Sequence, residues 1–261
     1  MDDKKAITGQ HCPMIPFLSR KAKTQVVSHL DVPHGDDLFR VALKRSPTAR
    51  RYTLRVSLAK QEITLTMPLK GSVAQASDFA HRYGGWIAER HKKFVPPILC
   101  QPGSIIPLRG EPHRIEHRPH ARGTVWTEAN AQGEPLIVVA GKAEYALRRI
   151  KDFLKKQAHH DLDRAVQRYT SMLGIPARRI ALKDPTSRWG SCSSAGRLNF
   201  SWRLILAPSD ILDYLAAHEV AHLKELNHSS RYWRVVESLF PEYENAEKWL
   251  KRHGSSLHRY Q

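Results

Sequence analysis

The longest uninterrupted helical pattern in the chain runs from Lys142 to Leu173 and contains neither proline nor glycine. Apolar side chains recur along it at helical spacing. Those expected on one face are Leu147, Ile150, Phe153 and Leu154. Gly174 and Pro176 follow directly and would end the helix. The pattern therefore predicts one long amphipathic helix with a stripe that must be buried against the rest of the fold.

The residues before this helix have mostly the alternating pattern of strands. Three stretches between residues 39 and 68, FRVALKR, RYTLRVSL and EITLTMP, alternate apolar and polar side chains. A helix is expected over residues 72–94, opened by Ser72 and ended by two prolines, and two further strand-like stretches reach residue 141. We therefore expect a basic β-rich region over residues 36–140, preceded by a tail or loosely packed arm over residues 1–35.

The residues after the long helix mix short strands with further helices. Strands are expected at RRIALKD, SRWGSCSS and LNFSWRLILA, and a helix should open near Ser209 and Asp210. Residues 141–255 are therefore expected to form a second part built from helices and a small sheet. Because strands and helices are segregated along the chain rather than strictly alternating, the fold class predicted is α+β.

Charge is the main signal in the composition. The net charge is +17, and seven Lys or Arg residues with no acid lie between positions 40 and 60. Such a surface attracts anions, so weak nucleic-acid binding is one hypothesis and a solvated basic sheet face is the other. Neither a secretory signal nor an apolar run long enough for a membrane span is found, so we expect a cytoplasmic protein with no membrane partner.

A short motif in the carboxy-terminal part indicates metal chemistry. His218 and His222 stand four residues apart in ILDYLAAHEVAHLKEL, so on a helix both imidazoles lie on one face and can reach one ion. Glu219 is rotated by about 100° from His218. It can therefore act as a general base toward a water activated by the metal without occupying a ligand position. The alternative is one core and one surface histidine on an amphipathic helix.

A third histidine strengthens the metal interpretation. His228 stands six residues after His222, beyond a chain reversal, and a catalytic zinc needs three protein ligands with one open position. The spacing of His218, His222 and His228 equals that of the ligands in metzincins, although Glu225 stands where the metzincin pattern has glycine. The sequence thus predicts one Zn²⁺ per chain held by His218, His222 and His228. The competing third ligands are downstream carboxylates: Glu237, Glu242 and Glu244.

The run DPTSRWGSCSSAGRLNFSWRLILAP, followed by HEVAHLKELNHSSRYW, resembles the YgjP-like metallopeptidase-domain family. The resemblance covers Asp184 to Trp233 in detail, and the β-rich region fits in general layout. It implies a zincin-like metal-dependent hydrolase, related at its active site to the SprT and WLM metalloproteases. Family members typically have Phe-Trp after the last ligand, whereas this chain has Tyr232 and Trp233.

The companion motif SRWGSCS is expected to form a turn and a strand beside the metal-binding helix. An edge strand at that place can pair an extended peptide, and Arg188 could bind a carboxylate or a phosphate. Arg188 and Trp189 are therefore candidate substrate-binding residues. The alternative is structural: Trp189 packs against the helix, Gly190 permits a tight bend and Cys192 is a small buried residue.

Three functions compete at this stage. The first is a zinc-dependent metallopeptidase acting on polypeptides, with Glu219 as the general base. The second is a metal-dependent nucleoside-triphosphate pyrophosphohydrolase acting on UTP, which the resemblance also implies, although no glycine-rich phosphate loop is present. The third is a nucleic-acid-binding protein with a structural zinc, which would not require a general base.

Overall fold

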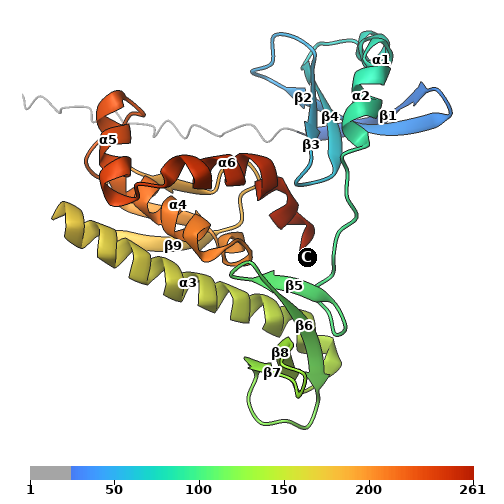
Figure 1. Cartoon of the computed structure of the whole chain (residues 1–261). Helices are drawn as coiled ribbons and strands as arrows, with labels where there is room; N and C mark the ends of the chain where they lie inside the picture. Colours follow the sequence, from blue (N-terminus) through green and yellow to red (C-terminus); the bar gives the residue numbers. More distant parts are fainter. Residues whose placement is uncertain (1–24) are drawn as a thin grey trace, which may run out of the picture. The chain divides into compact units, whose positions relative to one another are not determined.

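In the computed structural model, residues 25–261 are described and they form two compact units (Figure 1). The first contains residues 25–55 and 63–87, and the second contains residues 56–62 and 88–261. The division thus falls near residue 87, whereas the sequence places a boundary near residue 140. Most of the predicted arm, residues 1–24, lies outside the described residues, and that part of the prediction is untested.

The first unit is a four-stranded sheet with two helices. Its elements are β1 (Gln25–His34), β2 (Asp37–Ser46), β3 (Thr53–Ser57), β4 (Glu62–Pro68), α1 (Val73–Arg82) and α2 (Gly84–His91). The strand order is β1-β2-β4-β3, with β1 antiparallel and β4 parallel to β2. Residues 25–34 of the predicted arm therefore form a strand. Exposed His29, Asp31 and Pro33 alternate there with the more buried Leu30 and Val32, which is the period-2 pattern of a strand with one covered face. The strand is completed by antiparallel pairing with β2.

Part of the basic stretch serves the first unit itself. The Arg45 guanidinium donates hydrogen bonds of 2.7 and 2.8 Å to the backbone oxygens of Leu69 and Gly71, which anchors the connection between β4 and α1. The predicted helix over 72–94 is present as two helices, and the Ser72 side chain caps the first as expected. Binding of a nucleic acid by the other cations stays a prediction.

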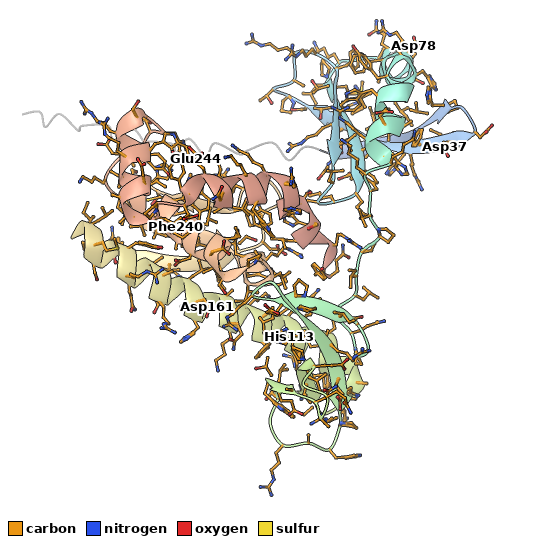
Figure 2. The ribbon with its side chains drawn as sticks, viewed as in Figure 1. Asp37, Asp78, His113, Asp161, Phe240 and Glu244 are labelled. Atoms are coloured by element: carbon orange, nitrogen blue, oxygen red, sulfur yellow. The ribbon has the colours of Figure 1, made fainter. Side chains whose placement is uncertain are left out.

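The second unit begins with a four-stranded sheet of order β5-β6-β8-β7. Its strands are β5 (Ile105–Leu108), β6 (Glu111–Arg118), β7 (Val125–Ala129) and β8 (Pro135–Ala140). The β5–β6 turn is tied to the long helix α3 (Ala146–Leu173), because Arg109 makes a bidentate ion pair of 2.7 and 2.9 Å with Asp161 (Figure 2). This pair fixes the sheet against the helix on which the rest of the unit is built.

Helix α3 confirms the predicted long amphipathic element. Of the residues expected on its covered face, Ile150 and Leu154 are buried, Phe153 packs against the core, and Leu147 alone is exposed. A short 3-10 turn, η1 (Ala143–Tyr145), precedes the helix. The buried residues of the helix follow helical spacing and include Ile150, Leu154, Leu162 and Tyr169, whereas Leu147 is 38% exposed. The buried face also includes the small residues Ala158 and Ala165, which allow neighbouring elements to approach closely.

The small sheet and the last helices complete the second unit. They are β9 (Arg179–Lys183), β10 (Gly190–Cys192), β11 (Arg197–Ser201), η2 (Trp202–Leu206), α4 (Ser209–Ala221), α5 (Ser230–Leu239), α6 (Tyr243–His253) and η3 (Gly254–Arg259). The strand order is β10-β11-β9, so β10 is an edge strand. Residues 202–206, predicted to continue a strand, form a 3-10 helix whose five residues are all buried. A short apolar run does not distinguish these two outcomes.

Helix α4 lies in the interior of the second unit. It contacts α3, α5, α6, β10 and η2, and most of its side chains are buried. A helix that is apolar around most of its circumference is held in one orientation by its neighbours. The polar residues at its carboxy-terminal end are therefore carried on a rigid support. The mixture of segregated strands and helices confirms the α+β class.

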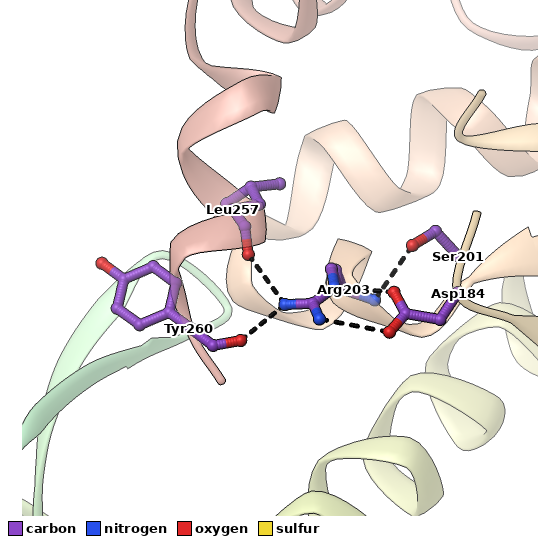
Figure 3. A network of polar contacts seen from close by, with 5 residues as sticks. All are labelled: Asp184, Ser201, Arg203, Leu257 and Tyr260. Carbon is purple, nitrogen blue, oxygen red and sulfur yellow. Dashed lines mark hydrogen bonds and ion pairs between the residues drawn. The ribbon is translucent and has the colours of Figure 1, made fainter. Parts of the chain in front are cut away.

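A buried arginine fixes the segment that leads into β10 (Figure 3). Arg203 donates from Nε and Nη2 to the two carboxylate oxygens of Asp184 at 2.7 and 3.1 Å. Its Nη1 donates to the backbone oxygens of Leu257 and Tyr260 at 3.3 and 2.5 Å. Burial opposes ionisation of Asp184, but the hydrogen bonds and charge of Arg203 outweigh it and hold the pKa of Asp184 below its ordinary value. One side chain thus joins the end of β9, η2 and the carboxy-terminal segment.

Candidate metal centre

The three predicted ligands come from the end of α4 and the turn that follows it. His218 lies in the last turn of α4, and His222 is its carboxy-terminal cap. The chain then reverses before α5, whose amino-terminal cap is Ser229, and His228 immediately precedes that cap. The reversal is short, so it brings His228 back beside the two helical histidines.

The distances between the imidazoles fit one shared ion. One ligand nitrogen from each histidine lies within 4.8 Å of the others, and Nε2 of His228 is 3.4 Å from Nε2 of His218. Two nitrogens bound tetrahedrally to zinc at 2.0–2.1 Å would be about 3.3 Å apart. Within residues 25–261, this group of three histidines is the only cluster of potential metal ligands, and Glu237, Glu242 and Glu244 are not part of it.

Two contacts orient the imidazoles from behind. Nδ1 of His222 lies 3.0 Å from the backbone oxygen of Glu225, which can only accept, so Nδ1–H is the donor and Nε2 is left for a metal. The Tyr214 hydroxyl lies 3.4 Å from Nδ1 of His218, which likewise leaves Nε2 facing the group. Glu225 stands where metzincins have glycine. Its backbone oxygen, and not its side-chain charge, makes the contact that orients His222.

The surroundings of His218 and His222 favour neutral imidazoles. Burial lowers the pKa of His218 to about 3, helped by the neighbouring His222 and His228. Burial also lowers the pKa of His222, although its hydrogen bond to Glu225 opposes the shift. A neutral imidazole offers the lone pair that a metal requires. Burial of His218 and His222 thus disfavours their protonation and leaves their nitrogen lone pairs free to bind a metal ion.

Glu219 faces the same space and lacks a partner. It is 4% exposed, and its Oε2 has no hydrogen-bond partner within the described part of the chain. Burial raises its pKa to about 8, against the lowering effect of the Arg188 charge. A buried carboxylate oxygen without a donor is costly unless a cation or a water satisfies it. Its position beside three convergent imidazoles fits a metal site with a general base.

Gly190 on β10 makes room for this carboxylate. A Cβ atom on Gly190 would lie 2.4 Å from Oε1 and 2.7 Å from Cδ of Glu219, closer than atoms can approach. Gly190 is not among the glycines with positive φ, so its backbone conformation does not itself require glycine. The glycine is required because β10 passes directly over Glu219. Sequence alone does not reveal this contact, since the two residues are far apart along the chain.

An aromatic layer supports the ligands from α5. Tyr232 is fully buried, and its ring stacks on His222 with centroids 4.4 Å apart and an interplanar angle of 27°. Its hydroxyl donates to the backbone oxygen of His218 at 3.0 Å, near the end of α4 where carbonyls lack helical partners. Trp233 lies 6.0 Å from both His218 and His228 between ring centroids. The Tyr232 hydroxyl therefore helps to hold the backbone at His218, a contact that the sequence does not reveal.

The metal-ligand group opens into a pocket of about 490 Å³ whose lining also includes Arg188, Cys192 and Leu226. Trp189 does not line this pocket. It packs against the carboxy-terminal segment, with its ring 5.0 Å from that of His258 and its Nε1 3.0 Å from where a Cβ on Gly254 would lie. Trp189 is also partly buried against the core of the second unit, which includes the buried residues of α4. Its expected packing against that helix stays a prediction.

The fold and site together define a chain of the metal-dependent hydrolase class. No helix in the described part of the chain has the length and apolar composition that a membrane crossing requires. Residues 50–253 match the family described as YgjP-like, metallopeptidase domain, and the chain belongs to that family.

Comparisons beyond the family give little more. No curated protein matches the chain. Among solved structures, the crystal structure of the metallopeptidase zymogen of Pyrococcus abyssi abylysin is 24% identical, covers 38% of this chain and 98% of its own, and has a TM-score of 0.33.

Proposed function

We propose that this protein is a zinc-dependent metallopeptidase in which His218, His222 and His228 hold one Zn²⁺ and Glu219 is the general base. The observation that carries the proposal is the buried, unpartnered carboxylate of Glu219 beside three convergent imidazole nitrogens. A structural zinc site closes its fourth position with a protein ligand. This group instead opens into a pocket, which disfavours the nucleic-acid-binding alternative with a structural zinc.

The residues present suit zinc. Three neutral imidazoles with one open position are a common catalytic zinc set, and their second nitrogens are held by Tyr214 and Glu225. When bound, zinc would supply Lewis acidity to a carbonyl oxygen and lower the pKa of a water to about 7.

Glu219 performs the proton transfers in this proposal. It stands next to His218 on α4 but reaches into the pocket from under Gly190. From there it accepts the proton of the attacking water and delivers it to the amine that leaves as the peptide bond breaks. Burial raises the pKa of Glu219, and the positive charge of Arg188 only partly opposes this shift. A zinc ion bound beside it would add a second positive charge that favours the ionised carboxylate, which is the form that accepts a proton.

The edge strand β10 favours a polypeptide substrate. The backbone N–H of Ser201 donates to the backbone oxygen of Trp189 at 2.8 Å, and the backbone N–H of Ser193 donates to the backbone oxygen of Arg197 at 3.0 Å. The backbone polar groups of residues 189, 191 and 193 therefore point toward β11. By alternation, the N–H and C=O groups of Gly190 and Cys192 point to the open edge beside the pocket. An extended peptide can add to such an edge and pass its backbone over the three imidazoles.

The UTP pyrophosphohydrolase alternative would need several donors for a triphosphate. Arg188 is the one Lys or Arg among the residues that line the 490 Å³ pocket. No glycine-rich loop presents backbone N–H groups there, as a phosphate cradle would require. The peptide is therefore the better-supported substrate.

The test compares Glu219→Gln with the unchanged protein after loading with zinc. Both are incubated with unfolded polypeptides and with UTP. We expect polypeptide cleavage by the unchanged protein, a loss of about 10²–10⁴-fold in Glu219→Gln, and equal zinc content. Glu237→Gln, which removes an exposed carboxylate outside the site, is the matched control and should keep its activity. UTP hydrolysis without peptide cleavage would refute the proposal, and full activity of Glu219→Gln would refute the role of the base.

A further inference from the structure

The three-stranded sheet that carries β10 has one buried face and one exposed face. Leu198 and Phe200 of β11 are buried in the core, and Ile180 and Leu182 of β9 pack against it. Because side chains alternate along a strand, the residues between them point the other way. We call this side the outer face and define it by Arg179, Lys183, Ser191, Arg197 and Asn199.

The outer face carries an excess of positive charge. Arg179 and Arg197 stand directly opposite each other in the pairing of β9 with β11, and both are exposed. Like charges at such a position destabilise a sheet. Lys183 is also exposed, and none of these three cations forms an ion pair with an acidic side chain of the described chain. Binding of an anion would offset this repulsion.

A pocket of about 460 Å³ lies where the outer face meets the metal centre. Lys183 and Arg188 supply two cations to its lining, and Ser191 and Asn199 supply neutral donors. Asp184 is the one acid among its lining residues, and both of its oxygens are already bound by Arg203. The pocket therefore has a net positive charge. Arg188, Gly190 and Ser191 line both this pocket and the pocket of the three histidines, so the two pockets adjoin.

Strand geometry relates this pocket to a peptide on β10. The Ser191 side chain lies on the outer face, where the side-chain amide of Asn199 donates to the Ser191 hydroxyl at 3.4 Å. In an antiparallel pair, residues directly opposite each other send their side chains to the same face. A peptide paired with Gly190 and Cys192 would thus send the side chain opposite Ser191 toward Lys183 and Arg188. Its two neighbours would point toward the metal centre.

We propose that this pocket is a specificity subsite that takes an acidic side chain, Asp or Glu, of the polypeptide substrate at the residue paired opposite Ser191. The inference rests on the proposed peptidase function, since it names which residue of the cleaved chain the site selects. Lys183 and Arg188 bind the carboxylate, and Ser191 and Asn199 donate hydrogen bonds to it. Arg179 and Arg197 extend the positive charge for substrates with further acids.

The test uses a set of peptides in which each position near the cleaved bond is Glu or its neutral isostere Gln. At one position only, the residue paired opposite Ser191, Glu should be preferred over Gln by about two- to fivefold in kcat/KM, the range for partly exposed ion pairs. The two adjacent positions should show no such preference. Lys183→Glu should abolish this preference or reverse it toward Gln. The matched control is Lys155→Glu, an exposed cation on α3 that lines neither pocket. It should keep the preference.

A binding measurement separates this inference from the proposed function. Zinc-loaded Glu219→Gln is titrated with fluorescent Glu and Gln peptides, so binding is read without cleavage. Tighter binding of the Glu peptide that depends on Lys183 supports the subsite even if no peptide is cleaved. Equal binding and equal cleavage of both peptides overturns the subsite while the peptidase stands. If UTP rather than the Glu peptide binds in a Lys183-dependent way, the pocket serves phosphate and the assignment is wrong.

Discussion

The close approach of β10 to Glu219 makes a sharp prediction for Gly190→Ala. The added Cβ would lie 2.4 Å from Oε1 and 2.7 Å from both Cδ and Cγ of Glu219, so the carboxylate must move or the strand must shift. Overpacking of this kind costs about 1–3 kcal/mol of unfolding free energy. Because Glu219 is the group displaced, we expect loss of polypeptide cleavage comparable to that of Glu219→Gln, with the three histidines and their zinc retained.

A double-mutant cycle isolates this contact. Glu219→Ala removes all three atoms that the new Cβ would meet, so Gly190→Ala should cost little further stability in that background. Urea unfolding of the four proteins gives the coupling free energy, and metal analysis with peptide cleavage reports the site. Equal destabilisation by Gly190→Ala in both backgrounds would refute the argument, since the glycine would then be needed for its backbone and not for Glu219.

Three further predictions concern the supports of the site. Tyr232→Phe keeps the ring on His222 but removes the donor to the His218 carbonyl, so zinc affinity, measured by competition with a chelator, should fall by about tenfold. Removing the imidazole of His228 should abolish most zinc binding, and full retention would contradict the ligand assignment. Asp184→Asn should destabilise the protein at pH 7 because the partner of the buried Arg203 is lost. The pKa of Asp184 is lowered on folding, so this stabilisation is present above its unfolded pKa of about 3.9 and is lost as pH falls through the folded value. The difference between the two proteins should therefore shrink in acid.

The cluster of three histidines could be predicted from sequence because its geometry is local. His218 and His222 are four residues apart on one helix, and the return to His228 takes six more, so helical spacing and one turn account for the group. The general base follows from the same helix. The strands and the long helix were likewise visible, since their periodicity is a property of consecutive residues.

The features that the sequence did not reveal depend on contacts between distant segments. Gly190 is explained only by Glu219 on another element, and Trp189 is covered by η3 near Gly254. The 3-10 form of residues 202–206 depends on burial on all sides. In each case tertiary packing decided between conformations that local preference leaves open.

The Arg203 network also has a consequence for the order in which the protein matures during synthesis (Figure 3). Two of its acceptors, the carbonyls of Leu257 and Tyr260, lie well after His228 along the chain. Ribosomes make the amino-terminal side first, so a nascent chain can assemble the three imidazoles before the strand that would receive a peptide is anchored. In a growing chain the three histidines would thus be in place before the carboxy-terminal residues help to hold the segment that leads into β10.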